Sequence, residues 1–130
     1  MTVAQQQLLH NVPILPVRNV RASQEFYNWV LGFEICWRWE DYFGSVKRDN
    51  IELYFQKTDQ SVNPVSVYWY VEDADAVLKE FEAEGGEIAE EIRSTPWGMR
   101  EFTFRDPNGH LIRVGHPEKE FASIEQFRFG

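Results

Sequence analysis

The sequence predicts an α+β fold in which two tandem βαβββ units form a curved, cup-like mixed β-sheet with the helices on the outside. The first observation is an internal repeat, because the segments 17–35 and 71–88 show the same order of features. Each has a valine ending an apolar run, a helix-capping residue, apolar residues at helical spacing, and a glycine turn followed by Glu-Ile. The second observation is that segments rich in β-branched and aromatic residues flank both repeats.

The first unit is expected at residues 11–56. Its opening strand, 11–17, contains Pro13 and Pro16, which lack the N–H group of a ladder and indicate an edge or irregular strand. Asn19 is expected to cap the helix that follows. The apolar face of this helix carries Ala22, Phe26 and Val30. Polar breaks separate the remaining strands, expected at 35–40, 42–48 and 51–56.

The polar segment 57–64 is the expected linker to the second unit at 65–116. This unit opens with a strand at 65–71, and Asp73 is expected to cap its helix. Its last strands are expected at 87–92, 99–105 and 110–115. Asp106 to Gly109 predicts a hairpin turn between the last two, because proline presets φ and Asn-Gly accepts positive φ. The tail, 117–130, contains three phenylalanines that are expected to pack on the domain or on a second subunit: Phe121, Phe127 and Phe129.

Composition narrows the possible partners of this 130-residue chain, which carries a formal net charge of −8. An acidic surface repels phosphate backbones, so nucleic acid is not an expected partner, whereas a cationic ligand is favoured. The alternative is that the acidity only maintains solubility. Aromatic residues make up 15% of the chain, enough to fill a core or to line a pocket for a flat ligand.

The sequence also gives expectations about compartment. Cys36 is the single cysteine, which excludes an intramolecular disulfide, and its apolar neighbours indicate a buried structural thiol. The N-terminus lacks the basic and apolar regions of a secretory signal, and no apolar run approaches a membrane span. We therefore expect a cytoplasmic protein without a membrane partner.

Two sequence motifs, LGFE at 31–34 and RDPNGHLIRV at 105–114, close the first helix and the second unit. Together with the tandem units they resemble the vicinal oxygen chelate superfamily, which holds glyoxalases, extradiol dioxygenases and bleomycin-resistance proteins. Three further segments are similar to the bleomycin-resistance branch: 40–55, 67–71 and 95–110. The resemblance implies a homodimer, often with an exchanged N-terminal strand, that sequesters a flat cationic glycopeptide antibiotic in crevices at the dimer interface.

The metal-binding members of this superfamily have four ligands on four strands. The resemblance places these positions at Val12, Glu52, Ser66 and Arg113. Only Glu52 is a suitable ligand, because valine cannot coordinate a metal and arginine is itself a cation. We therefore expect no metal and no cofactor. The scattered histidines, His10, His110 and His116, are expected to be surface or structural residues. Glu52 and Arg113 are expected to face the same cup as an ion pair.

The expected ligand site is aromatic. Strand alternation places Glu52, Tyr54, Tyr68 and Tyr70 in the cup and the intervening Leu53, Val67, Trp69 and Val71 in the core. The resemblance assigns the stacking of ligand rings to Trp97 and to Trp37 or Trp39, and it places the acidic pair Glu40 and Asp41 near the positive tail of the ligand. The full set of expected ligand-binding residues is Trp37, Trp39, Tyr42, Phe43, Glu52, Tyr54, Tyr68, Tyr70, Trp97, Met99 and Arg113.

The sequence leaves three functions open. The first is a binding protein without catalysis for a bleomycin-type antibiotic. The second is a glyoxalase- or dioxygenase-like enzyme acting on a small oxygenated substrate, including a metal-free site in which Glu52 or Glu101 acts as a base and Arg113 holds an anion. The third is a binder of another aromatic metabolite, since similarity of fold does not fix function.

Overall fold

The computed structural model of the chain describes residues 5–118 and contains two consecutive units. Unit 1 contains β1 (Ile14–Val17), α1 (Val20–Leu31), β2 (Glu34–Trp39), β3 (Phe43–Arg48) and β4 (Ile51–Lys57). Unit 2 contains β5 (Ser66–Tyr70), α2 (Ala74–Ala83), β6 (Glu87–Ser94), β7 (Met99–Arg105) and β8 (Leu111–Pro117). The predicted order of helices and strands is confirmed in both units.

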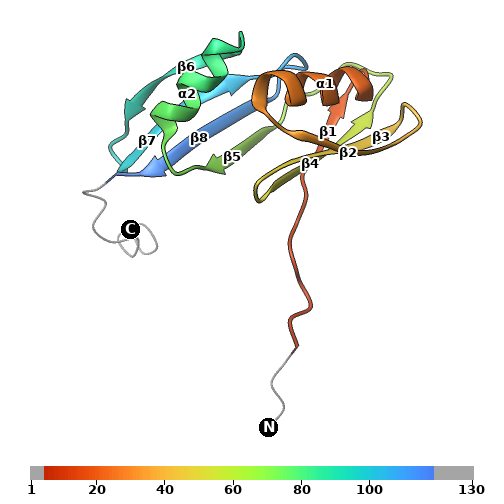
Figure 1. Cartoon of the computed structure of the whole chain (residues 1–130), viewed down its shortest axis with the longest axis horizontal. Helices are drawn as coiled ribbons and strands as arrows, with labels where there is room; N and C mark the ends of the chain where they lie inside the picture. Colours follow the sequence, from red (N-terminus) through yellow and green to blue (C-terminus); the bar gives the residue numbers. More distant parts are fainter. Residues whose placement is uncertain (1–4, 119–130) are drawn as a thin grey trace.

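Each unit forms its own four-stranded mixed sheet, with the orders β1-β4-β3-β2 and β5-β8-β7-β6. The first strand of each unit pairs in parallel with the last, and the other pairs are antiparallel. The two sheets lie side by side, and α1 and α2 cover the same side of the pair (Figure 1). The predicted α+β fold of two tandem βαβββ units is therefore confirmed. We call the side of each sheet opposite its helix the open face.

Local sequence explains where the helices begin. The Oδ1 atoms of Asn19 and Asp73 accept hydrogen bonds from the backbone N–H groups of Ala22 and Ala76, at 2.8 and 3.1 Å. Both predicted N-caps are thus confirmed. The buried face of α1 differs from the prediction, since Ala22 is exposed. The buried residues of α1 are Val20, Ser23, Gln24, Tyr27, Val30 and Leu31.

A polar residue can lie on the buried face of α1 because its hydrogen bonds are satisfied. The side chain of Gln24 donates to the carbonyl oxygens of Trp37 and Ser45 and accepts from Arg38. Burial of an amide is tolerated only with such partners. This explains why periodicity of apolar residues alone misjudged the face.

The core of the protein lies between the helices and the inner faces of the sheets. Leu53 and Trp69 are buried there, with Val67 and Val71 packed against the cluster, as strand alternation predicted. β1 is an edge strand, which its two prolines predicted. It begins at Ile14 rather than at residue 11, and the backbone N–H of Tyr54 donates to the carbonyl of Pro13.

The turn at Asp106 to Gly109 joins the two units as well as two strands. The hydroxyl of Tyr27 on α1 donates to Oδ2 of Asp106 at 2.7 Å, and the Asn108 side chain donates to Ser23 Oγ at 3.1 Å. Burial and the neighbouring Asp106 carboxylate raise the pKa of Tyr27 well above its usual value, so this hydroxyl stays a donor. The predicted hairpin turn is confirmed.

His110, expected as a surface or structural residue, is a buried structural residue. Its Nδ1 accepts a hydrogen bond from the backbone N–H of Val65, and its Nε2 lies 2.7 Å from the carbonyl oxygen of Pro16. The first bond leaves the proton on Nε2, which therefore donates to Pro16. His110 thus links β1 of unit 1 to the segment that enters unit 2.

A second link between the units is an ion pair. Arg48 on β3 binds both carboxylate oxygens of Glu80 on α2, at 2.7 and 3.0 Å, and also donates to the carbonyl of Leu31 at the end of α1. Two parallel hydrogen bonds between a guanidinium and a carboxylate fix orientation as well as distance. They hold α2 against unit 1.

The N-terminal segment, residues 5–13, extends away from the body of the molecule on the side of the open faces (Figure 1). Leu8 and Leu9 in this segment are exposed. Within residues 5–118, no helix is long and apolar enough to cross a membrane. The tail phenylalanines at 121, 127 and 129 lie outside the described residues.

Candidate functional site

The open face of unit 1 carries a cluster of aromatic rings. Trp37 on β2 lies 5.4 Å from Phe43 on β3 and 5.2 Å from Tyr54 on β4, measured between ring centroids. The register explains the meeting, because Trp37 and Tyr54 both pair with Ser45 of β3. Trp37 is 39% exposed, so the cluster offers an indole surface to solvent.

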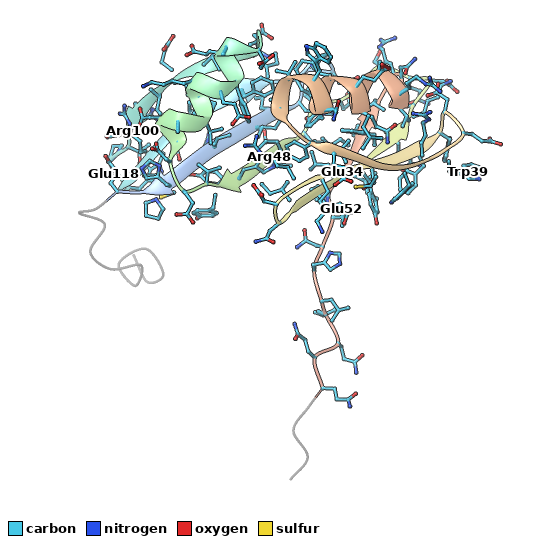
Figure 2. The ribbon with its side chains drawn as sticks, in the orientation of Figure 1. Glu34, Trp39, Arg48, Glu52, Arg100 and Glu118 are labelled. Atoms are coloured by element: carbon cyan, nitrogen blue, oxygen red, sulfur yellow. The ribbon has the colours of Figure 1, made fainter. Side chains whose placement is uncertain are left out.

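Trp39 and Tyr42 extend this cluster toward the end of the β2–β3 hairpin, where Figure 2 shows Trp39. Their rings meet edge to face at 5.9 Å, and Tyr42 accepts a hydrogen bond from Gln56. Tyr42 also lines a small acidic pocket of about 360 Å³. The other residues of this pocket are Glu40, Asp41, Lys57 and Asp59.

Glu52 lies on the same open face, on β4 (Figure 2), where its carboxylate accepts a hydrogen bond from Ser45 Oγ at 2.9 Å. The predicted ion pair between Glu52 and Arg113 is not formed. The reason is topological, since Glu52 belongs to the sheet of unit 1 and Arg113 to the sheet of unit 2. Glu52 is therefore an acidic group beside the aromatic cluster, with Lys47 of β3 opposite it in register.

The open face of unit 2 is organised around Glu101 on β7, which is 5% exposed. Its Oε2 accepts a hydrogen bond from the hydroxyl of Tyr68 at 2.8 Å, and its Oε1 lies 3.8 Å from Nε of Arg113. Burial and the bond to Glu101 raise the pKa of Tyr68, so its hydroxyl remains protonated and donates. Arg113 is half exposed and pairs with Glu101 instead of Glu52.

Gly115 on β8 makes room for the contact between Tyr68 and Glu101. A Cβ atom at this position would meet the Tyr68 hydroxyl at 2.3 Å and Glu101 Cβ at 2.9 Å. Any side chain would push the tyrosine away, so the sequence needs glycine here. Tyr70 continues the row from Tyr68, with ring centroids 5.0 Å apart, and is 70% exposed.

Trp97 lies in the loop between β6 and β7 and is 40% exposed. The loop is held by backbone bonds from Thr95 N to Met99 O and from Gly98 N to Thr95 O, and by a bond from Met99 N to Thr95 Oγ1. Gly98 has φ of 86°, which a non-glycine residue rarely adopts. Met99 itself is buried beneath the loop end rather than exposed to a ligand.

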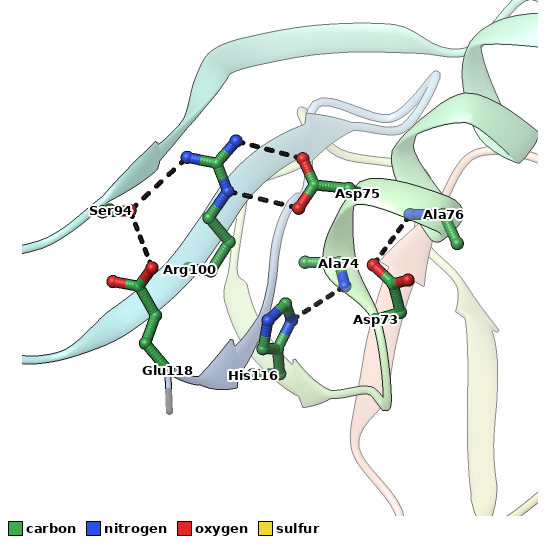
Figure 3. Close-up of polar contacts among 8 residues, drawn as sticks. All are labelled: Asp73, Ala74, Asp75, Ala76, Ser94, Arg100, His116 and Glu118. Atoms are coloured by element: carbon green, nitrogen blue, oxygen red, sulfur yellow. Dashed lines mark hydrogen bonds and ion pairs between the residues drawn. The ribbon is translucent and has the colours of Figure 1, made fainter. Parts of the chain in front are cut away.

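A polar network next to this loop fixes the end of unit 2 (Figure 3). Arg100 binds both carboxylate oxygens of Asp75, at 3.2 and 3.0 Å, and Ser94 bridges Arg100 and Glu118. His116 accepts a hydrogen bond from the backbone N–H of Ala74, the first residue of α2. This network accounts for His116 as a structural residue, and it ties β6, β7, β8 and α2 together.

The positions that would hold a metal in the superfamily are divided between the two units of this chain. Val12 precedes β1, Glu52 is on β4, and Ser66 and Arg113 are on the sheet of unit 2. Among residues 5–118, no group of three or more His, Cys, Asp or Glu side chains is arranged to hold a metal ion. Ser66 and Arg113 share an open face with Glu101, whose carboxylate contacts Tyr68 and Arg113.

The two tryptophans assigned to ring stacking are far apart in one chain. Trp37 is on β2, an outer strand of one sheet, and Trp97 is in the loop that follows β6, an outer strand of the other. Figure 1 shows these strands at opposite ends of the molecule. One chain therefore cannot place both indoles on the same ligand.

A groove of about 630 Å³ lies between the units, on the side of α2. It runs along α2 beside the Arg48–Glu80 pair, with Phe33 and Trp69 at its base. Of the predicted ligand-binding residues only Tyr70 borders it. The predicted site is a set of exposed faces and not a closed cavity of a single chain.

Two features of these faces were not anticipated from the sequence. Cys36 is exposed instead of buried, because it lies at a β-bulge between Ile35 and Trp37 in an edge strand. Arg93 on β6 lies over the ring of Trp97, with its guanidinium carbon 5.5 Å from the ring centroid. Bulges in β6 between Ile88 and Arg93 shift its register, so simple alternation could not place this arginine.

Comparison with known proteins gives a family match over most of the chain. The model of the Glyoxalase/Bleomycin resistance protein/Dioxygenase superfamily matches residues 7–114. No curated protein sequence matches the chain.

Solved structures share the fold. A bleomycin-binding protein from bleomycin-producing Streptomyces verticillus, in complex with copper(II)-bleomycin, is 27% identical with a TM-score of 0.71, covering 89% of this chain and all (100%) of that one. A bleomycin resistance determinant encoded on transposon Tn5 is 22% identical with a TM-score of 0.74, covering 84% and 98%. Lactoylglutathione lyase from Agrobacterium tumefaciens is 20% identical with a TM-score of 0.70, covering 82% and 92%.

Proposed function

We propose, because the chain belongs to the Glyoxalase/Bleomycin resistance protein/Dioxygenase superfamily, that it binds a planar cationic molecule of bleomycin type and holds it unchanged between two copies of the chain. The observation that carries this proposal is the exposed indole surface on two open faces, at Trp37 and Trp97. Exposed indoles gain stacking and cation–π energy when a flat cation covers them.

The separation of the two tryptophans supports a dimeric site. A sandwich of one ligand by both indoles requires Trp37 from one copy and Trp97 from the other, which gives two equivalent crevices in a symmetric dimer. The extended segment 5–13, with exposed Leu8 and Leu9, is suited to pack on the second copy. We propose that this segment is exchanged between the two chains.

Charge supports a cationic ligand. The formal net charge of the chain is −8, and the Glu52 carboxylate lies on the same open face as Trp37 and Tyr54. Glu40 and Asp41 line the acidic pocket near Tyr42. An acidic face raises the local concentration of a cation and strengthens its binding.

The first test is a calorimetric titration with metal-free bleomycin, followed by mass spectrometry of the recovered antibiotic. We expect one ligand per chain and an unchanged mass. Trp97→Ala and Trp37→Ala should each weaken binding by about tenfold, the loss of a stacked ring with its buried area. Trp29→Ala is the matched control, since Trp29 is 78% exposed on the outer side of α1 and should have no effect. Equal effects of all three substitutions would contradict the site.

Mixing the variants tests the shared crevice. In a heterodimer of Trp37→Ala and Trp97→Ala chains, one crevice lacks both indoles and the other keeps both. After the two variants are unfolded and refolded together, a fraction of sites with full affinity should appear. If each site is formed within one chain, refolding the mixture will restore no high-affinity binding.

The second candidate function is metal-free acid–base catalysis on the open face of unit 2. The observation favouring it is the buried carboxylate of Glu101, which contacts the Tyr68 hydroxyl beside the half-exposed Arg113. Such a carboxylate can accept a proton while the arginine holds an anionic group. Turnover of an oxygenated substrate that is abolished by Glu101→Gln and retained by Glu52→Gln would support catalysis over sequestration.

A further inference from the structure

We infer that Arg93 is an internal competitor for the ligand, a cation that covers Trp97 in the free protein and is displaced when a planar ligand stacks there. This inference rests on the proposed function, because it assumes that Trp97 stacks on the ligand. It adds a residue that determines the affinity and selectivity of the site. The geometry that points to it is the guanidinium of Arg93 at 5.5 Å from the ring centroid of Trp97.

Arg93 is on the open face of unit 2. It pairs in register with Glu101 across β6 and β7, and directly paired residues project to the same side of a sheet. Trp97 follows four residues later, in the loop that ends this face. Arg93 therefore lies between the buried Glu101 carboxylate and the exposed indole.

The guanidinium of Arg93 is weakly held. None of the hydrogen bonds or ion pairs within residues 5–118 involves it, in contrast to Arg100, whose guanidinium is fixed by Asp75 and Ser94. The nearest carboxylate on the same face, Glu101, is already bound by Tyr68 and lies beside Arg113. The contact with Trp97 holds this side chain, and an exposed cation–π contact is a weak one.

Trp97, by comparison, is in a fixed loop. Three hydrogen bonds close the turn from Thr95 to Met99, and the backbone N–H of Glu118 donates to the carbonyl of Gly98. When a ligand competes for this ring, the arginine is the partner that moves. When the ligand binds, its planar group replaces the guanidinium of Arg93 over the indole. The net binding energy is therefore the stacking energy of the ligand less the energy of the lost Arg93–Trp97 contact.

The test uses N-methylquinolinium, a planar cation that quenches indole fluorescence on contact, and needs no assumption about the physiological ligand. The quenching due to Trp97 is the difference between the whole protein and its Trp97→Phe variant. In Arg93→Ala this difference should increase by about two- to fivefold, the equivalent of one exposed cation–π contact. Neutral quinoline should show an increase as well, because it competes for the same ring surface.

Two controls separate displacement from a general change of charge. Arg105→Ala removes the same charge from the other end of β7, where Arg105 pairs with Glu87, and should leave the quenching of Trp97 unchanged. Arg93→Lys keeps the charge and weakens the planar contact, so it should fall between the wild type and Arg93→Ala.

The inference is overturned if Arg93→Ala quenches no more than the wild type, or if the increase persists equally in the Trp97→Phe background. An increase confined to the cationic probe and matched by Arg105→Ala would also overturn it in favour of simple charge repulsion. The outcome is independent of the proposed antibiotic, since a protein that does not bind bleomycin at all would still show the uncovering of Trp97.

Discussion

Replacing Tyr27 by phenylalanine should weaken the interaction between the two units and leave the packing of their cores unchanged. The Tyr27 side chain is fully buried, at 0% exposure, and its hydroxyl donates to Oδ2 of the equally buried Asp106. The other carboxylate oxygen keeps its bonds from the backbone N–H groups of Asn108 and His110. The substitution therefore leaves one buried oxygen without its partner.

The magnitude follows from these contacts. A hydrogen bond to a charged group contributes about 1.5–3 kcal/mol, and an unpaired buried acceptor is penalised by a similar amount. The ring is retained, so its packing against Phe33 and Phe55 is unchanged and no cavity forms. We expect the free energy of unfolding to fall by about 2 kcal/mol, with a decrease in Tm of roughly 5–10 °C.

The assay is urea denaturation at fixed protein concentration, followed by circular dichroism and by tryptophan fluorescence. Tyr70→Phe is the control, because Tyr70 is exposed and loss of its hydroxyl should change the free energy of unfolding by less than about 0.5 kcal/mol. A similarly small change for Tyr27→Phe would refute the argument that the bond to Asp106 joins the units. Transitions that no longer coincide between the two probes would show that the units unfold separately.

Three further predictions concern charge and exposure. Arg100 lowers the pKa of Asp75 through their hydrogen bonds. The stability that this pair contributes is therefore present above the unfolded pKa of Asp75, about 3.9, and is lost as the pH falls through the lower folded value. A stability difference between wild type and Asp75→Asn that does not shrink below about pH 4 would contradict this. Both side chains of the Arg48–Glu80 pair are partly exposed, so Glu80→Gln should lower the free energy of unfolding by only about 0.5–1 kcal/mol. In urea denaturation the difference between wild type and variant should be smaller at about 1 M salt, because salt screens the charges. An effect independent of salt would refute the electrostatic argument. Cys36 should react with a thiol reagent in the native protein at the rate of a free thiol, and protection until unfolding would show that it is covered.

Much of the fold followed from local patterns in the sequence. The capping residues Asn19 and Asp73 mark both helix starts, because a cap needs only the chain that follows it. Strand alternation separated Leu53 and Trp69, which are in the core, from Tyr54 and Tyr68, which are on the open faces. Side-chain alternation along a strand and helix capping depend only on residues close together in the chain, so both can be predicted from the sequence.

Which charged residues pair with one another could not be predicted from these local patterns. Glu52 and Arg113 have the right alternation to share a face, but they belong to different sheets, and Glu101 is the partner of Arg113. His110, two residues before the core residue Ile112, is buried and makes hydrogen bonds with Pro16 of unit 1 and with Val65, the residue before β5. Each of these contacts depends on how the two units dock, which no local pattern encodes.

The sequence by itself therefore determined the two βαβββ units, the helix caps, the turn at Asp106 to Gly109 and the aromatic character of the open faces. Only the tertiary structure decided that Trp37 and Trp97 lie at opposite ends of the folded molecule and that Arg93 covers Trp97. The physical reason is that side-chain period fixes a residue's face within one strand, whereas bulges and sheet order, set by long-range packing, fix its neighbours.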